Sequence, residues 1–354
     1  MLKAILISIS SLILLSCVDE SSFEVGERDE EASSEWKPIE IGKSYTVTSN
    51  VFGTTRNISI RLPQQYFAEP EKDFPVLYLI DGGAEQDFPH IAGILQSIDI
   101  NWTVEPMILV GVETVNRAAE LTPPSDNPRY NDVFPERGGA DEFRAFLEGD
   151  VIPWVEAKYR TDKRRILLGE SLAGLFVTET YLNAPSLFTH FAAVSPSLWW
   201  DELAVPLTAS EILNESDKKT PSLYLTMGNE GGEMQRGLDV LIKALQDNEV
   251  PNWTYVDRRN HEDHGTIYHP AALDMVRTNF STPYRVGTNS ESFWMFKDGM
   301  VPPLSDKAKD NIEKPCDSLN AQVITFEAYN EDPETWRGMC VIMKAGQKPT
   351  LQAK

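Results

Sequence analysis

Basic residues are scarce in this chain of 354 residues. Lys and Arg number 32 against 54 Asp and Glu, so the formal net charge is −22. An acidic surface repels phosphate backbones, which excludes nucleic acid as an expected partner. The same charge makes neutral or cationic substrates easier to accept than polyanions. Hydrophobic residues form 41% of the sequence, enough to bury a sizeable core.

The apolar run at the start of the chain, Ala4–Leu15, is too short to span a membrane. With Lys3 before it, this run has the layout of a secretory signal. It ends Leu14-Leu15-Ser16-Cys17, which resembles the bacterial lipobox, and Val18 rather than Asp follows. We expect a signal peptide over 1–16, lipidation of Cys17 and a lipoprotein of the bacterial envelope. The outer membrane, on its periplasmic or surface side, is the expected location. A plain signal peptide with a chance cysteine is the alternative.

Only two further cysteines occur, Cys316 and Cys340. In an oxidising compartment they can form one disulfide, with two separate thiols as the alternative. Both lie in segment 284–354, which we treat as a small C-terminal appendage with one strand-like run over 322–329. The acidic, serine-rich stretch 17–38 has too few apolar groups to fold and is expected to be a flexible tether.

Region 39–283 has the pattern of one α/β domain. Tyr45–Asn50 and Asn57–Leu62 alternate apolar and polar residues, which predicts an antiparallel hairpin. Near-continuous apolar runs indicate strands buried on both faces. These runs cover 75–80, 107–112, 165–168, 191–194 and 223–227. Helical spacings lie between them, so we expect a three-layer sandwich around a mostly parallel central sheet.

The motif Gly169-Glu170-Ser171-Leu172-Ala173-Gly174 lies between an expected strand and an apolar helix. Small residues two positions before and after the serine permit a sharp strand-to-helix turn. Such a turn lifts the hydroxyl above the sheet edge, at a helix N-terminus. Ser171 is therefore the candidate nucleophile, and the alternative is an ordinary serine in a structural turn.

Histidine is rare, which narrows the choice of the base that a serine nucleophile needs. Three of the 5 histidines stand together at positions 261, 264 and 269, after the last expected strand, Asn252–Asn260. We assign His264 as general base, with His261 as the alternative. The spacing His261-Glu-Asp-His264 is one residue short of the helical zinc motif, so no metal and no cofactor are expected.

Two carboxylates follow the strand 223–227, where the acid of a catalytic triad belongs. We assign Glu230, with Glu233 as an alternative that can instead open the next helix. If both only face solvent, a Ser-His dyad remains. Donors for the oxyanion are expected from the backbone N–H groups of Leu172 and Gly83, where glycine permits close approach to a substrate.

Together these segments resemble the esterase family that includes enterochelin esterases, esterase D and feruloyl esterases. The resemblance covers about residues 40–282. It implies an α/β-hydrolase fold, Ser171 as nucleophile, His264 as base, and an oxyanion hole from Gly83 and Leu172. Glu170 stands where many members carry histidine, which leaves the elbow intact. The matching segments are Val76–Gly82, Val110–Val112 with Arg117 and Leu121–Pro123, Gly138–Phe143, Ile152-Pro153 with Lys158–Arg160, Gly169–Phe176, Ser195–Asp201 and His264-Gly265.

Three side chains are candidates for a substrate pocket. Trp199 and Trp200 follow a buried strand at the same sheet edge as Ser171, and either wall the pocket or pack in the core. Arg117 lies beyond the end of another strand and either contacts substrate or pairs with Glu120.

The expected function is hydrolysis of a carboxylic ester through an acyl-enzyme. Its partners are a small-molecule or polysaccharide-linked ester and, through the lipid anchor, a membrane. Siderophore, feruloyl and acetyl esters all remain open. A peptidase or amidase on the same fold usually needs a cap over the site, and no long insertion is present for one. A non-catalytic binding lipoprotein is the third alternative.

Overall fold

The computed structural model describes residues 37–101, 104–215, 221–281, 284–286, 322–327 and 337–343. Its main body is an eight-stranded sheet with strand order β1-β2-β4-β3-β5-β6-β7-β8. Strands β3 to β8 run parallel, while β1 and β2 form an antiparallel hairpin at one edge. Their bounds are β1 Lys43–Thr48, β2 Thr55–Arg61, β3 Phe74–Ile80, β4 Ile108–Val112, β5 Thr161–Glu170, β6 His190–Val194, β7 Ser222–Met227 and β8 Trp253–Asp257.

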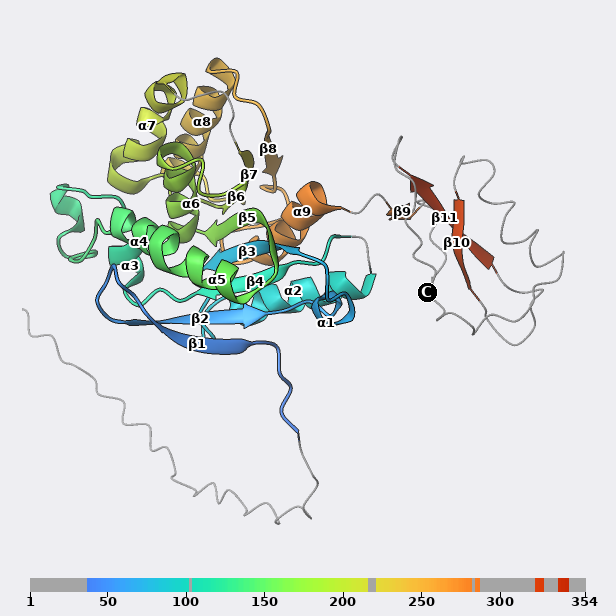
Figure 1. Ribbon diagram of the computed structural model, residues 1–354. Coiled ribbons are helices and arrows are strands. Elements are labelled where there is room, and N and C mark those ends of the chain that lie inside the picture. Colours follow the sequence, from blue (N-terminus) through green and yellow to red (C-terminus); the bar gives the residue numbers. More distant parts are fainter. Residues whose placement is uncertain are drawn as a thin grey trace, which may run out of the picture. The chain divides into compact units, whose positions relative to one another are not determined.

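Helices cover both faces of this sheet, because alternate strand residues point to opposite sides. One face packs against α2 and α9, and the other against the helices from α3 to α8 (Figure 1). The three-layer α/β-hydrolase arrangement expected from the sequence is therefore confirmed. The helices are α1 Gln65–Ala68, α2 Phe88–Asn101, α3 Arg117–Leu121, α4 Ala140–Phe146, α5 Ile152–Lys158, α6 Leu172–Asn183, α7 Trp200–Glu215, α8 Gly232–Asp247 and α9 Tyr268–Phe280.

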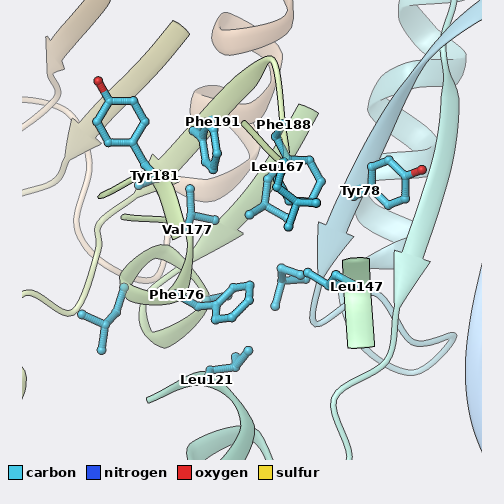
Figure 2. Packing of buried hydrophobic residues seen from close by; sticks show 14 of the residues in the cluster. Tyr78, Leu121, Leu147, Leu167, Phe176, Val177, Tyr181, Phe188 and Phe191 are labelled. Carbon is cyan, nitrogen blue, oxygen red and sulfur yellow. The ribbon is translucent and has the colours of Figure 1, made fainter. Parts of the chain in front are cut away.

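Aromatic side chains fill the larger core cluster around α6. Tyr78 of β3 meets Phe188 edge-on, with ring centroids 5.6 Å apart, and Phe188 meets Phe191 of β6 at 5.6 Å. Figure 2 shows these rings together with Phe176 of α6. Such edge-to-face contacts add to the stabilisation that burial of the rings supplies. This core fixes α6, the helix that begins directly after Ser171.

The sequence predicted the positions of the strands well. The hairpin and the five buried runs coincide with β1 to β7, and β8 is shorter than expected, at Trp253–Asp257. Between β4 and β5, α4 and α5 are joined by a π-helical turn, Leu147–Val151. None of the helices within the described ranges combines the length and apolar composition that a membrane crossing requires.

The C-terminal segment contributes a three-stranded sheet, β10-β11-β9. Its strands are β9 Tyr284–Val286, β10 Gln322–Glu327 and β11 Arg337–Met343, all antiparallel. The strand expected over 322–329 is therefore present, and the sequence missed the other two. Cys340 lies on β11, but Cys316 lies outside the described residues, as do Cys17, the signal peptide and nearly all of the tether.

Candidate active site

Ser171 stands at a sharp bend between β5 and α6. Its backbone dihedrals are φ 60° and ψ −119°, a strained conformation for a residue with a side chain. A Cβ on Gly169 would lie 2.7 Å from Ala173, so glycine is required for this approach of strand and helix. The Ser171 N–H donates to the carbonyl of Val194 (3.0 Å), and its own carbonyl accepts from the Ser197 N–H (2.9 Å). The expected strand–turn–helix geometry is present, and the neighbouring strand holds it.

His264 and Glu230 form a hydrogen bond of 2.9 Å between Nδ1 and Oε2. They come from the loops after β8 and β7, which the Asn229 N–H ties together by donating to the Glu262 carbonyl (2.7 Å). The Glu230 side chain is 8% exposed and that of His264 46% exposed. The hydrogen bond to Glu230 is the main cause that raises the pKa of His264. Because Nδ1 is held by the carboxylate, Nε2 remains for the nucleophile.

The alternatives considered for acid and base are not part of this pair. Glu233 is exposed in the first turn of α8, and His261 is exposed in the loop after β8. The structure therefore brings Glu230 to His264, as the order of strands and loops suggested.

The Ser171 hydroxyl lies 3.3 Å from the hydroxyl of Ser197, which is 2% exposed. Among the described residues, Ser197 and not His264 is its hydrogen-bond partner. Catalytic hydrogen bonds often tighten only when substrate binds. Ser197 stands in the Ser-Pro-Ser segment after β6, and no pattern in the sequence predicted its contact with Ser171.

The two expected oxyanion donors differ in their present partners. Leu172 is the first residue of α6, so no carbonyl four residues earlier in the helix accepts its N–H. The Gly83 N–H instead donates to Oε1 of Gln86 (2.9 Å). The Gln86 amide in turn donates to the Thr114 carbonyl (3.0 Å), which links the loops after β3 and β4. The Gly83 N–H can donate to an oxyanion only if its hydrogen bond to Gln86 breaks.

Arg117 lies beside the nucleophile rather than with the partner that the sequence suggested. Its Nε is 2.6 Å from Oδ2 of Asp81, and its Nη2 donates to the carbonyl of Glu170 (3.1 Å). The expected pairing with Glu120 is wrong, because Glu120 is buried against Arg56 at 2.7 Å. With 42% of its side chain exposed, Arg117 remains able to contact substrate.

The two tryptophans have different environments. Trp200 is fully buried, its indole N–H donates to the Pro123 carbonyl (3.1 Å), and its ring stacks on Tyr130 at 4.5 Å. For Trp200 the core alternative holds, because a buried ring that is covered by its neighbours cannot line an open pocket. Trp199 is half-buried, lies 6.2 Å from the Phe134 ring, and stays a candidate for the pocket.

Two carboxyl groups at this edge of the sheet have unusual acidities. Burial raises the pKa of Glu170 to about 7, while the charges of His264 and Arg117 oppose the rise. Burial, and then the charge of Asp81, raises the pKa of Asp87 to about 6. The sequence placed Glu170 in the elbow without assigning it a role, and Asp87 was missed altogether.

His90 and His269, in the first turns of α2 and α9, lie with ring nitrogens 3.0 Å apart. Both side chains are exposed. The part of the chain that the structure describes holds no group of three or more His, Cys, Asp or Glu side chains arranged for a metal ion. The pair therefore ties two helices on one face of the sheet.

Residues 49–289 match a family model described as "Putative esterase". The chain belongs to this esterase family. The matched range includes Ser171, Glu230 and His264, and it leaves Cys17 and Cys316 outside.

Several proteins similar in sequence to this chain have esterase names. The ferri-bacillibactin esterase BesA of Bacillus subtilis (strain 168) is 33% identical over 181 residues, which is 47% of this chain and 62% of BesA. The match thus spans less than two thirds of that relative.

Solved structures share the fold. An IroE-like serine hydrolase from Shewanella oneidensis is 25% identical with a TM-score of 0.58, covering 68% of this chain and 80% of that one. The siderophore hydrolase EstB from Aspergillus nidulans, 21% identical, has a TM-score of 0.61 and coverages of 70% and 97%.

Proposed function

We propose that this chain is a serine hydrolase that cleaves carboxylic esters through an acyl-enzyme. One observation carries the proposal. A buried carboxylate, Glu230, fixes the imidazole of His264 at 2.9 Å, on the two loops that follow β7 and β8. Ser171 occupies a strained elbow at the end of β5, in the same sheet. Nucleophile, base and acid then come from strand ends in the order that acyl transfer on this fold requires.

In the proposed reaction, the Ser171 hydroxyl attacks the ester carbonyl while its proton moves to Nε2 of His264. The developing oxyanion accepts hydrogen bonds from the N–H groups of Leu172 and Gly83. His264 then protonates the leaving alcohol, and the C–O bond to that alcohol breaks. A water molecule, deprotonated by His264, cleaves the acyl-serine ester and releases the acid. Glu230 holds the imidazole tautomer and stabilises the imidazolium throughout.

Replacement of the nucleophile tests this mechanism. Ser171→Ala should lower kcat on p-nitrophenyl butyrate by at least about 10³-fold, because no other described residue takes over the covalent step. Its thermal stability should stay close to that of the parent. Ser210→Ala, at an exposed serine of α7, is the matched control and should keep full activity. Unchanged turnover in Ser171→Ala would rule out the mechanism.

For the substrate we propose an iron-chelator ester of the siderophore type. Two findings support this substrate. The relative BesA is named as an esterase of ferri-bacillibactin, and the chain belongs to the esterase family. Full-length protein should hydrolyse ferri-bacillibactin faster than a feruloyl ester of a sugar or an acetyl ester. Faster turnover of the feruloyl ester would move the proposal to a polysaccharide-linked substrate.

Two alternative functions can be tested with the same purified protein. A peptidase or amidase would cleave a p-nitroanilide of the same acyl group, which we expect to be turned over far more slowly than the ester. A purely binding protein would hydrolyse neither substrate and would also fail to react with an organophosphate.

The cellular location is a separate proposal. We propose that Cys17 carries the lipid that anchors the chain in a bacterial envelope, supported by the sequence before it. Metabolic labelling with a radioactive fatty acid should mark the parent and not Cys17→Ser. Equal labelling of both would refute the anchor.

A further inference from the structure

Glu170 occupies the last position of β5, one residue before the nucleophile. It pairs with Val194 of β6, and its carbonyl accepts from Nη2 of Arg117 at 3.1 Å. One oxygen of its carboxylate, Oε1, is buried and has no hydrogen-bond partner among the described residues. The backbone of Glu170 is therefore held firmly, while its carboxylate is not tied into a structural ion pair within the described part of the chain.

Charged and titratable groups from several elements face this carboxylate. The charges of His264 and Arg117 favour its ionised form, and those of Asp87 and Glu230 oppose it. The phenol of Tyr268 is buried, its hydroxyl has no hydrogen-bond partner in the described chain, and its pKa is raised by burial and then by the charges of Asp87 and Glu170. The facing elements are the loop after β8, α3, the turn before α2, the loop after β7 and α9.

We propose that Glu170 is a second carboxylate for the catalytic histidine, which stabilises the His264 imidazolium through its charge rather than through a hydrogen bond. Glu230 holds Nδ1 directly at 2.9 Å. Glu170 acts from the strand that carries Ser171, where the positive charge on the imidazole develops as the serine loses its proton. The inference rests on the proposed roles of Ser171 and His264.

The electrostatic relation between the two groups is mutual. The charge of Glu170 raises the pKa of His264, after the larger contributions of Glu230, and the charge of His264 lowers that of Glu170. Because burial raises the pKa of Glu170 to about 7, its carboxyl group changes charge near neutral pH. Above that pH the carboxylate is ionised and favours the imidazolium.

The contacts of Arg117 explain why the Glu170 carboxylate has no ion-pair partner among the described residues. Its guanidinium is engaged by the carboxylate of Asp81 at 2.6 Å and by the backbone carbonyl of Glu170, not by the Glu170 side chain. A full ion pair between Arg117 and Glu170 would cancel the negative charge that faces His264. The ion pair between Asp81 and Arg117 prevents this, because it occupies the guanidinium.

The test is a pH profile of kcat/KM for p-nitrophenyl butyrate with the full chain and its Glu170→Gln variant, between about pH 5 and pH 9. The variant should lose about three- to tenfold in kcat on the alkaline plateau with little change in KM, because the imidazolium forms only during the reaction. Its acidic limb should move to lower pH, because His264 loses a neighbouring negative charge. Glu170→Asp should restore much of kcat and move the limb back, and Glu233→Gln should leave both unchanged.

An NMR titration of the His264 ring in the resting protein separates this inference from the proposed function. A lower titration midpoint in Glu170→Gln, and in the second neutral variant Glu170→Met, supports the charge coupling even if the parent hydrolyses none of the esters tried. An unchanged midpoint in whichever of these variants is folded overturns it. An active parent whose acidic limb stays in place in Glu170→Gln overturns it as well.

Discussion

The groups on the two sides of Ser171 differ in whether they are already positioned for the proposed reaction. On the side of β7 and β8, the carboxylate of Glu230 already holds His264, and the backbone bond between Asn229 and Glu262 joins their loops. On the side of β3 and β4, the N–H of Gly83 is bonded to Gln86. A buried N–H without a partner is costly, so this donor is satisfied internally while no substrate is bound. The proposed base, His264, is thus already held in place, whereas the Gly83 N–H, the proposed oxyanion donor, is occupied by another acceptor.

Removing the acid on the preorganised side should have the largest effect. Glu230→Gln should lower kcat by about 10²- to 10⁴-fold, because the amide no longer fixes the productive tautomer of His264 or balances the imidazolium. Steady-state kinetics on p-nitrophenyl butyrate measure this. Glu233→Gln, which removes an exposed carboxylate of α8, should stay within about twofold of the parent. Equal losses in both variants would show that the acid is not Glu230.

The next largest effect is expected from the ion pair on the other side. Arg117→Met should lower kcat about tenfold, because it releases the Glu170 carbonyl and leaves the carboxylate of Asp81 without its partner. Arg61→Met breaks a comparable pair with Asp99, 2.6 Å long, at the opposite end of the sheet. It should reduce the melting temperature and leave kcat unchanged. A similar fall in kcat for both variants would show that Arg117→Met lowers kcat only by destabilising the fold.

A smaller effect should follow when the partner of Gly83 is removed. Gln86→Met keeps the length of the side chain and cannot accept the Gly83 N–H, so that donor no longer has to break a bond before it meets the oxyanion. We expect kcat to rise about twofold to threefold, a change at the lower end of the net free energy of one hydrogen bond. A fall of tenfold instead would mean that Gln86 is needed to hold the loop after β3 in place.

The smallest effect concerns stability and pH. The pKa of Glu170 is about 7 in the folded chain, and in the unfolded chain it is near its ordinary value of 4.5. The folded state therefore binds the proton more tightly, and its stability falls as pH rises from about 4.5 to about 7. Glu170→Gln removes this loss, so its melting temperature should exceed that of the parent by a few degrees at about pH 8 and match it at about pH 5. The opposite order at pH 8 would contradict the raised pKa.

Much of the fold followed from the sequence, and so did the placement of Ser171, Glu230 and His264 after strand ends. Near-continuous apolar runs located the parallel strands β3 to β7, and the order of the strands fixed which loops carry His264 and Glu230. The strand-to-helix turn at Ser171 was predictable because close backbone contact between Gly169 and Ala173 requires small residues within one short motif. Local pattern and strand order are therefore sufficient where the geometry is set by the backbone.

The remaining features depend on contacts between distant side chains. The bond between Gly83 and Gln86, and the choice of Asp81 over Glu120 by Arg117, arise from how the loops after β3 and β4 pack. Burial decided that Trp200 belongs to the core. No periodicity in the sequence encodes these distances.

Covalent labelling of the nucleophile tests the central claim most directly. The full chain is treated with a fluorophosphonate, digested and examined by mass spectrometry, in parallel with His264→Ala and His261→Ala. We predict phosphonylation of Ser171 in the parent and in His261→Ala, and its near absence in His264→Ala, because only an activated serine reacts quickly. Labelling of Ser171 that is equally fast in His264→Ala, or labelling of a different serine, would contradict the account.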